Sequence, residues 1–233
     1  MLPVQNVSLW IEQHTLLMFA VLIVICNIAW LMLCHKVIEI KWYEALVIAL
    51  LHDMIGYAAM RLLAIIEVGG DISRAANMRL FGAVFLLPVL YYLWAKIRKH
   101  DKAVVMDIAS ICLAIGLISG RLNCLTSGCC AGSLISAESG LRWPIREIEL
   151  VFYIAFIAWY CPKILRRETK GQVYPVFLIS YGLLRFVLEW FRVEYSGIGN
   201  LHFGTIWSIA SILLGTSIYA ELKPSKSKKR GRK

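Results

Sequence analysis

Long apolar runs recur along the whole chain, and they constrain the fold more than any other feature. They cover about residues 15–34, 43–66, 80–95, 103–118, 148–165, 172–191 and 203–221. Each run is close to the ~20 residues that a helix needs to cross the hydrocarbon core of a bilayer. Lipid tolerates no unpaired backbone, and alternating strand patterns are absent, so helices are the expected spanning form. The sequence predicts an all-α integral membrane protein with seven transmembrane helices.

The composition excludes a disordered chain and argues against an ordinary soluble enzyme. Of the 233 residues, 59% are hydrophobic and 17% are charged, whereas soluble domains are ~45–50% apolar. The formal net charge of +10 would suggest nucleic-acid binding on a soluble protein. On so apolar a chain, the positive charges are first interpreted as signals that orient the protein in the membrane. We expect no nucleic-acid partner. The N-terminus has no basic region and the first run has full span length, so we expect no cleaved signal peptide.

The lysines all lie on one side of the expected membrane. They fall in alternate connectors and in the C-terminal tail: Lys36, Lys41, Lys96, Lys99, Lys102, Lys163, Lys170, Lys223, Lys226, Lys228, Lys229 and Lys233. By the positive-inside rule this side is cytoplasmic, which predicts an N-terminus outside and a C-terminus inside. We expect one membrane domain over 1–222 with an outer loop at 119–147, followed by a basic cytoplasmic tail at 223–233.

The basic residues on or near the outer side are all arginines. They are Arg61, Arg74, Arg79, Arg121, Arg142, Arg146, Arg185 and Arg192. Several lie within or at the ends of spans, where an unpaired arginine costs about 2.5–3.5 kcal/mol. The planar guanidinium group binds phosphate or carboxylate through two parallel hydrogen bonds, which lysine cannot do. This pattern predicts a site for an anionic headgroup at the outer face.

The sixth apolar run carries a polar stripe. Tyr181, Arg185, Glu189 and Arg192 have the spacing i, i+4, i+8 and i+11, which places them on one face of a helix, and Tyr174 extends it. Arg185 and Glu189 can neutralise each other, which would leave Arg192 to receive an anion. An ion pair that only fixes helix packing is the alternative. A similar row of polar residues, Asp53, Tyr57 and Arg61, lies in the second run. It could belong to the same site, or Asp53 could simply be paired within the helix bundle.

The segment after the fourth run is rich in small and turn-forming residues. Gly120, Gly128 and Gly132 allow the backbone to bend and approach a ligand closely, with Arg121 at the end of the span. The segment continues to Arg142. We expect a loop that closes over a lipid headgroup; a plain connecting loop is the alternative.

Three of the seven cysteines, Cys124, Cys129 and Cys130, share this segment. An outer location permits a disulfide, for example between Cys124 and one of the other two, which leaves one thiol over. A reactive thiol near Arg121 and inert packing are the other interpretations. The CxxxxCC spacing differs from that of redox or zinc motifs, so we expect no metal site.

Two motifs together resemble the bacterial prolipoprotein diacylglyceryl transferase family. They are Gly120-Arg121-Leu122-Asn123-Cys124 with Gly128-Cys129-Cys130-Ala131-Gly132, and Tyr181-Gly182-Leu183-Leu184-Arg185 with Glu189 and Arg192. Arg61 matches an arginine of the family's second span. Phe81-Gly82-Ala83 and Arg142-Trp143-Pro144 are weaker matches to its His-Gly-Gly and His-Pro elements. The resemblance extends from about the second to the seventh run.

The resemblance implies transfer of a diacylglyceryl group from phosphatidylglycerol to a protein cysteine thiol at the outer leaflet, as in lipoprotein biogenesis. Arg121, Arg185 and Glu189 would be catalytic. Substrate would be bound by Arg61, Tyr181, Arg192, Arg142, Gly120, Gly128 and Gly132. The implied partners are an anionic phospholipid and a lipobox-containing preprotein, with no cofactor or metal. The implied location is the bacterial cytoplasmic (inner) membrane, with the protein multi-pass and its active site facing the outer leaflet.

The chain departs from the family pattern on the acceptor side. Cys124 stands where the family has an asparagine, Cys129 where an acidic residue is usual, and Phe81 in place of a histidine. This suggests a divergent, cysteine-containing branch in which the phospholipid donor is better supported than the acceptor. The alternatives are a phospholipid-binding or transporting membrane protein, and a thiol-redox membrane protein.

Overall fold

The computed structural model describes residues 4–72, 79–136, 140–193, 197–198 and 201–222. In this part of the chain there are seven α-helices: α1 (Val4–Leu33), α2 (Trp42–Glu67), α3 (Leu80–Arg98), α4 (Lys102–Thr126), α5 (Ile145–Leu165), α6 (Val173–Glu189) and α7 (Phe203–Leu222). A 3-10 turn, η1 (Cys34–Lys36), follows α1, and two short strands, β1 (Gly197–Ile198) and β2 (Leu201–His202), pair antiparallel before α7. Arg74 and the expected tail at 223–233 lie outside the described residues.

The expectation of an all-helical membrane protein is confirmed. Six of the described helices are long and apolar enough to cross a membrane, namely all except α6. With 17 residues, α6 is slightly shorter than the others. The chain is therefore a multi-pass membrane protein, and its helices agree closely with the apolar runs.

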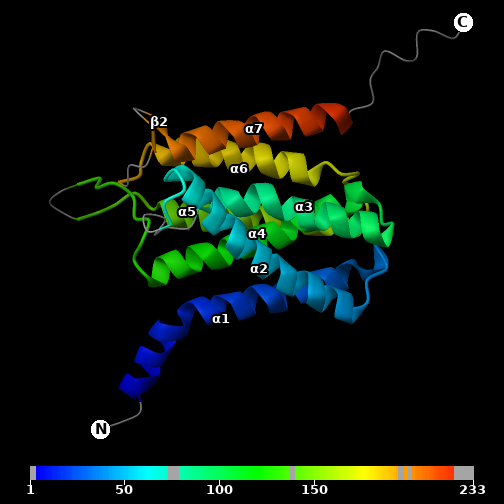
Figure 1. Ribbon diagram of the computed structural model, residues 1–233, viewed down its shortest axis with the longest axis horizontal. Coiled ribbons are helices and arrows are strands. Elements are labelled where there is room, and N and C mark those ends of the chain that lie inside the picture. The colour runs from blue at the N-terminus through cyan, green and yellow to red at the C-terminus, as the bar shows by residue number, and fades with distance from the viewer. Residues whose placement is uncertain (1–3, 73–78, 137–139, 194–196, 199–200, 223–233) are drawn as a thin grey trace, which may run out of the picture.

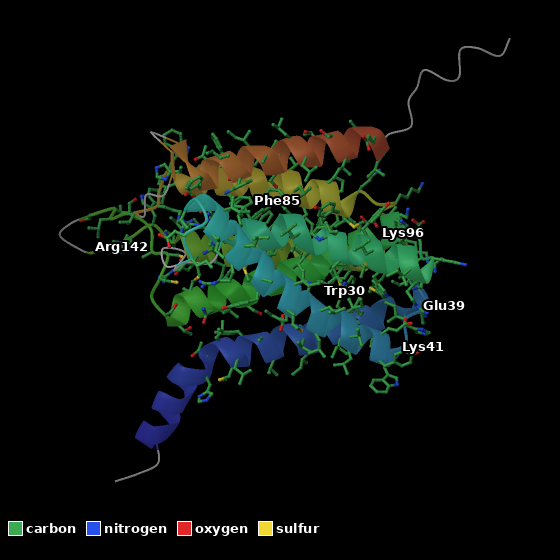
Figure 2. The ribbon with its side chains drawn as sticks, viewed as in Figure 1. Trp30, Glu39, Lys41, Phe85, Lys96 and Arg142 are labelled. Atoms are coloured by element: carbon green, nitrogen blue, oxygen red, sulfur yellow. The ribbon has the colours of Figure 1, made fainter. Side chains whose placement is uncertain are left out.

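The helices lie side by side in a bundle (Figure 1), with α4 against α1, α3, α5 and α6. The two edges of the bundle are formed by α1, which packs on α2 and α4, and by the α6–α7 pair. Lys41 and Lys96 lie at one end of the bundle and Arg142 at the other (Figure 2). These two lysines therefore lie at the opposite end of the fold from Arg142.

The connection between α4 and α5 is shorter than the loop expected at 119–147. Helix α4 continues to Thr126 and α5 begins at Ile145, so both ends of that range are helical. The helix extends past the apolar run because Arg121, its main polar residue there, is buried and paired within the bundle. Arg121 and Cys124 thus have rigid helical positions.

A carboxylate fixes α4 to the start of α6. Asp107 of α4 accepts hydrogen bonds from the backbone N–H groups of Gly171 at 2.7 Å and Val173 at 2.8 Å, and from the Thr169 hydroxyl at 2.5 Å. Val173 is the first residue of α6 and Gly171 lies two residues before it, so neither N–H group has a partner within the helix. This contact holds α6 against α4.

Close packing of α2 on α3 depends on Gly82. A methyl group there would collide with the backbone carbonyl of Ala59, which cannot rotate away. We expect Gly82→Ala to lower the free energy of unfolding by about 1–3 kcal/mol, the usual cost of overpacking. Gly56→Ala is the matched control, because its methyl would meet only the flexible end of Leu87 at 3.3 Å. Thermal unfolding in detergent should separate the two variants; equal melting temperatures would contradict this account of the interface.

Candidate functional site

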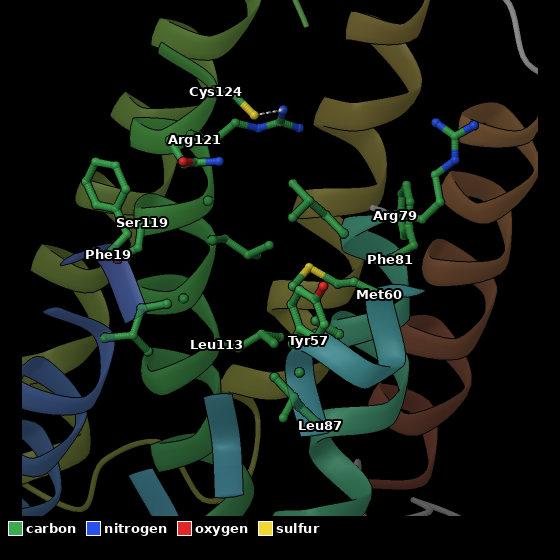
Figure 3. A pocket seen from close by; sticks show the side chains of 18 of the residues that line it. Phe19, Tyr57, Met60, Arg79, Phe81, Leu87, Leu113, Ser119, Arg121 and Cys124 are labelled. Atoms are coloured by element: carbon green, nitrogen blue, oxygen red, sulfur yellow. Dashed lines mark hydrogen bonds between the residues drawn. The ribbon is translucent and has the colours of Figure 1, made fainter. Parts of the chain in front are cut away.

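A cavity of about 690 Å³ lies between the helices, toward the end of the bundle that carries Arg142. Residues of α1, α2, α3, α4, α6 and α7 line it. Figure 3 shows Arg121 and Cys124 on one side, Arg79 and Phe81 on the other, and Tyr57, Leu87 and Leu113 deeper in the bundle. The cavity is thus charged at one end and largely apolar along the rest of its length, although His52 and Asp53 also line it.

The apolar part of the cavity reaches the outer surface of the bundle. Leu16 and Leu17 of α1 and Met54 and Tyr57 of α2 line the cavity and are exposed. In a membrane these surfaces face hydrocarbon, since no water is available there to solvate them. An acyl chain can therefore pass between lipid and cavity without crossing a polar surface.

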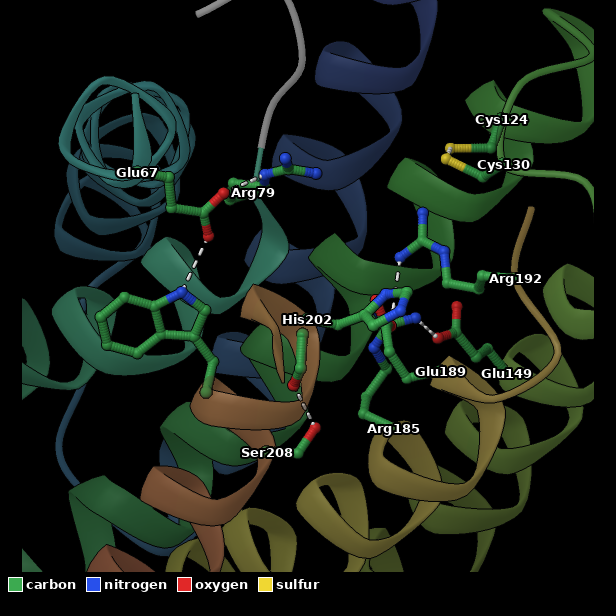
Figure 4. A network of polar contacts seen from close by, with 12 residues as sticks. Glu67, Arg79, Cys124, Cys130, Glu149, Arg185, Glu189, Arg192, His202 and Ser208 are labelled. Atoms are coloured by element: carbon green, nitrogen blue, oxygen red, sulfur yellow. Dashed lines mark hydrogen bonds and ion pairs between the residues drawn. The ribbon is translucent and has the colours of Figure 1, made fainter. Parts of the chain in front are cut away.

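At the charged end, one carboxylate is shared by two arginines. Glu149 of α5 contacts Arg121 Nε with one oxygen. Its other oxygen lies 2.7 Å from Arg185 Nη1 (Figure 4). The Glu149 side chain is 0% exposed, and those of Arg121 and Arg185 are 4% and 6% exposed. Removing such charges from water is costly unless they are paired, and here one carboxylate provides the counter-charge for both arginines.

The polar stripe of α6 continues this network. Arg185 Nη2 lies 3.1 Å from Glu189, and Arg192 Nη1 lies 3.5 Å from the same carboxylate. The expectation that Arg192 is left to receive an anion is therefore corrected: it shares Glu189 with Arg185. Three arginines and two glutamates give the network one net positive charge, and four of its members, Arg121, Arg185, Glu189 and Arg192, line the cavity, whereas Glu149 does not.

A second ion pair forms the opposite wall. Arg79 Nε lies 2.5 Å from Glu67, whose other oxygen accepts a 2.8 Å hydrogen bond from the Trp207 indole. All three residues line the cavity. This pair connects α2, the start of α3 and α7, so the wall facing Arg121 is also held by charge-assisted contacts.

Cys124, Cys129 and Cys130 converge at the mouth of the cavity. The Sγ atoms of Cys124 and Cys130 are 4.0 Å apart, and the three sulfurs all lie within 4.8 Å of one another. The seven cysteines all lie in the described part of the chain, as free thiols. The three thiols therefore form a group that could hold a metal ion, which the linear spacing did not predict.

Only some of the residues expected to bind substrate line the cavity. Arg192 and Gly120 line the cavity, whereas Arg61, Tyr181, Arg142, Gly128 and Gly132 lie outside its lining. Arg142 is exposed and donates to the Gly132 carbonyl at 3.1 Å. Gly132 packs directly against the Trp143 backbone, where a methyl group would collide, so it serves loop folding.

Tyr181 is fully buried beneath the charged network. Its ring lies 5.1 Å from that of Phe81, and the Arg185 guanidinium lies 5.9 Å from the Phe81 ring. Phe81, one of the positions at which the chain departs from the pattern of the family it resembles, therefore presents an aromatic face to a cation. Such a contact is worth about 0.5–2 kcal/mol.

Sequence reasoning missed Glu149, Glu67 and His202 as parts of the site. His202 Nδ1 lies 3.8 Å from Glu189. Glu149 had a detectable signal: Ile145, Glu149, Tyr153 and Phe156 are all buried and have the spacing i, i+4, i+8 and i+11, the same pattern that identified the α6 stripe. Glu67 and His202 stand at helix ends, where a solvated charge is the usual expectation.

Replacement of Glu149 tests whether it holds the network together. We expect Glu149→Gln to lower the free energy of unfolding by about 3–5 kcal/mol, because two buried arginines lose a shared counter-charge. Glu147→Gln, one half-turn away on the same helix, is the control. Its side chain is 47% exposed and 3.7 Å from Arg146, so the loss should stay below about 1 kcal/mol. Thermal unfolding in the same detergent compares them, and a stable Glu149→Gln variant would refute the assignment.

The Cys130 thiol is expected to be ionised near neutral pH. A hydrogen bond from the Cys124 thiol and the nearby guanidinium groups of Arg121 and Arg192 lower the pKa of Cys130 to about 5, against the opposing effect of burial. The thiolate is the reactive form. Alkylation of Cys130 by iodoacetamide in chelating buffer should therefore change little between about pH 6 and 8, whereas an ordinary thiol accelerates nearly 100-fold.

The control for this prediction is Cys124→Ala, which removes the hydrogen-bond donor. Its Cys130 should regain a steep rise of alkylation rate with pH, read from the mass of the Cys130 peptide. A steep rise in the unaltered protein would show that Cys130 is an ordinary thiol.

Comparison with known proteins identifies the family to which the chain is similar. The family model for prolipoprotein diacylglyceryl transferase matches residues 7–220. Proteins named phosphatidylglycerol–prolipoprotein diacylglyceryl transferase are similar to the chain. The one from Clostridium tetani is 23% identical over 60% of this chain and 62% of its own length. The one from Methylibium petroleiphilum is 28% identical over 64% and 60%, and the one from Helicobacter pylori 25% identical over 70% and 64%.

The chain matches somewhat under two thirds of the length of these curated relatives. The family match, by contrast, covers nearly all of this chain, including both sequence motifs and every helix that lines the cavity. The resemblance inferred from the motifs is therefore confirmed, and the chain belongs to the prolipoprotein diacylglyceryl transferase family.

Proposed function

We propose that this protein transfers the diacylglyceryl group of phosphatidylglycerol to a cysteine thiol of a lipobox-containing preprotein. The observation that carries the proposal is a single cavity with an apolar opening on the bundle surface and a charged end lined by Arg121, Arg185 and Arg192. A phospholipid has the same two-part chemistry. Membership of the family and the names of the relatives support the reaction class.

The donor lipid enters with its acyl chains along the apolar part of the cavity, past Leu16, Leu17 and Tyr57. Its phosphate then meets Arg121 and Arg185. Both guanidinium groups are held by Glu149, so they are positioned before the lipid arrives. Preorganised donors of this kind stabilise charge that develops in the transition state, and no reorganisation is needed during reaction.

In the reaction, the thiol sulfur of the acceptor forms a bond to the glyceryl carbon that carries the phosphate. The bond between that carbon and the phosphate oxygen breaks, and glycerol phosphate leaves with the electron pair. The thiol proton is released, so atoms and charge balance. Negative charge grows on the departing phosphate, which is where Arg121 and Arg185 act, while Glu189 orients Arg185 and Arg192.

The proposal places the cavity at the outer leaflet of the bacterial cytoplasmic (inner) membrane. The lysines Lys41 and Lys96 mark the opposite, cytoplasmic end of the bundle. Helix α6 counts as the seventh span, because 17 residues are about 25 Å of helix and lie within the range of known spans. Seven spans put the two termini on opposite sides, and with the lysine-bearing end in the cytoplasm the N-terminus is outside and the C-terminus inside.

The test uses purified protein with radiolabelled phosphatidylglycerol and a lipobox peptide that contains one cysteine. We expect labelled peptide and released glycerol phosphate in equal amounts. Arg121→Ala and Arg185→Ala should each lower the rate by about 10²–10³-fold, the usual effect of losing one such donor. Arg166→Ala, an exposed arginine just after α5, is the matched control and should keep the full rate.

Two outcomes would overturn the proposal. Full activity of both Arg121→Ala and Arg185→Ala would show that these arginines take no part in the reaction. Capture of one phospholipid per chain without any glycerol phosphate would instead identify a lipid-binding or transporting protein. Folding of each variant is checked by its melting temperature, so a loss of activity is not mistaken for a loss of structure.

A further inference from the structure

We propose that Cys124, Cys129 and Cys130 form a binding site for one thiophilic metal cation, for which Zn²⁺ is the probe. The site lies at the mouth of the cavity, beside Arg121, and does not depend on the proposed transferase activity. It uses three side chains that depart from or lie beside the family motif, and to which the transfer reaction assigns no role.

The distances between the thiols match a metal site. All three Sγ atoms lie within 4.8 Å of one another, and those of Cys124 and Cys130 are 4.0 Å apart. A tetrahedral Zn²⁺ with Zn–S bonds of about 2.3 Å places its sulfurs about 3.8 Å apart. Thiolate ligands favour Zn²⁺ and Cu⁺ over Mg²⁺ and Ca²⁺, which fixes the chemical class of the ion.

The backbone around the thiols is shaped to bring them together. Gly128 and Cys130 both have positive φ, 68° and 57°, so the chain turns back on the end of α4 directly after Ser127. The second of these is unusual for a residue with a side chain. This turn places Cys129 and Cys130 against Cys124, which is on the last turn of α4.

Neighbouring polar groups hold the ligands from outside, as second-layer contacts do in metal sites. Arg146 donates to the carbonyls of Cys124 and Cys129, at 3.2 Å each. The Ser127 hydroxyl lies 3.3 Å from Cys129 Sγ and donates to the Asn123 carbonyl at 2.7 Å. Cys129 is exposed, so an ion has a path to the site from the aqueous side.

Charge also favours the site. Three thiolates and one Zn²⁺ carry a net charge of −1, which would be expensive in an uncharged surrounding. Arg121 Nη1 lies 3.9 Å from Cys124 Sγ, and Arg192 lies beside the Cys124–Cys130 pair (Figure 4). These guanidinium groups compensate the excess negative charge of the occupied site.

A metal explains the number of thiols better than a disulfide. A disulfide between two of them would leave the third unused, whereas a metal ion engages all three. Three protein ligands leave one position of a tetrahedral ion open, as in zinc sites that bind water or substrate. Because the three cysteines line the cavity, that position lies at the mouth of the cavity.

The test is metal titration of the full-length protein, purified with reductant in detergent and then stripped with chelator. We expect one Zn²⁺ per chain, with release of protons because thiols must lose theirs to bind. Co²⁺ in place of Zn²⁺ should produce an intense thiolate-to-cobalt charge-transfer band in the near ultraviolet, which a carboxylate or histidine site would not produce.

Cys129→Ser should reduce Zn²⁺ affinity at least 10-fold and remove most of the charge-transfer band; it is chosen because Cys129 is exposed and its loss should not affect folding. The double variant Cys26→Ser/Cys161→Ser removes two thiols outside the group and should bind like the unaltered protein. Unchanged binding by Cys129→Ser would overturn the proposal. So would a protein that binds no Zn²⁺ and whose intact mass, without reductant, shows a disulfide among the three.

Discussion

The shared carboxylate of Glu149 is the contact on which the rest of the site depends. It sits between Arg121 of α4 and Arg185 of α6, so one side chain from α5 joins three helices. Each arginine alone would be costly in a bilayer. Paired through one acid, they remain charged, and Glu189 extends the same arrangement to Arg192. The charged groups of the network are therefore paired with one another before any ligand binds.

Helix α4 carries this arrangement because it is held to α6 near both of its ends. Asp107 binds the backbone at the start of α6, and Arg121 meets Arg185 through Glu149 about four turns later. These two polar contacts on one apolar helix define the rotation and the depth of α4 relative to α6. Hydrophobic packing alone defines them poorly, because lipid is as apolar as the helix surface. The cavity between α4 and the other helices therefore keeps a defined shape although its walls are largely apolar.

The helices were predictable because run length and hydrophobicity are local properties, whereas the site was predictable only in part. The α6 stripe could be found because Tyr181, Arg185 and Glu189 repeat with helical spacing along one face. The role of Glu149 and the true partner of Arg192 could not be found, because both depend on which helices touch. The end of α4 was misplaced for a related reason: Arg121 looks like a loop residue until its buried partner is known.

The same limit applies to the cysteines, and here it has a chemical consequence. Spacing along the chain compares Cys124, Cys129 and Cys130 with known linear motifs and finds none. The fold adds a turn at Gly128 and Cys130 that brings the sulfurs within 4.8 Å of one another, directly beside arginines of the site. Guanidinium groups stabilise thiolates, phosphate and an anionic metal–thiolate centre through the same electrostatics. A positively charged end that suits a phospholipid headgroup therefore also suits a thiolate cluster, so any ion bound there would compete with the headgroup for the charge of Arg121.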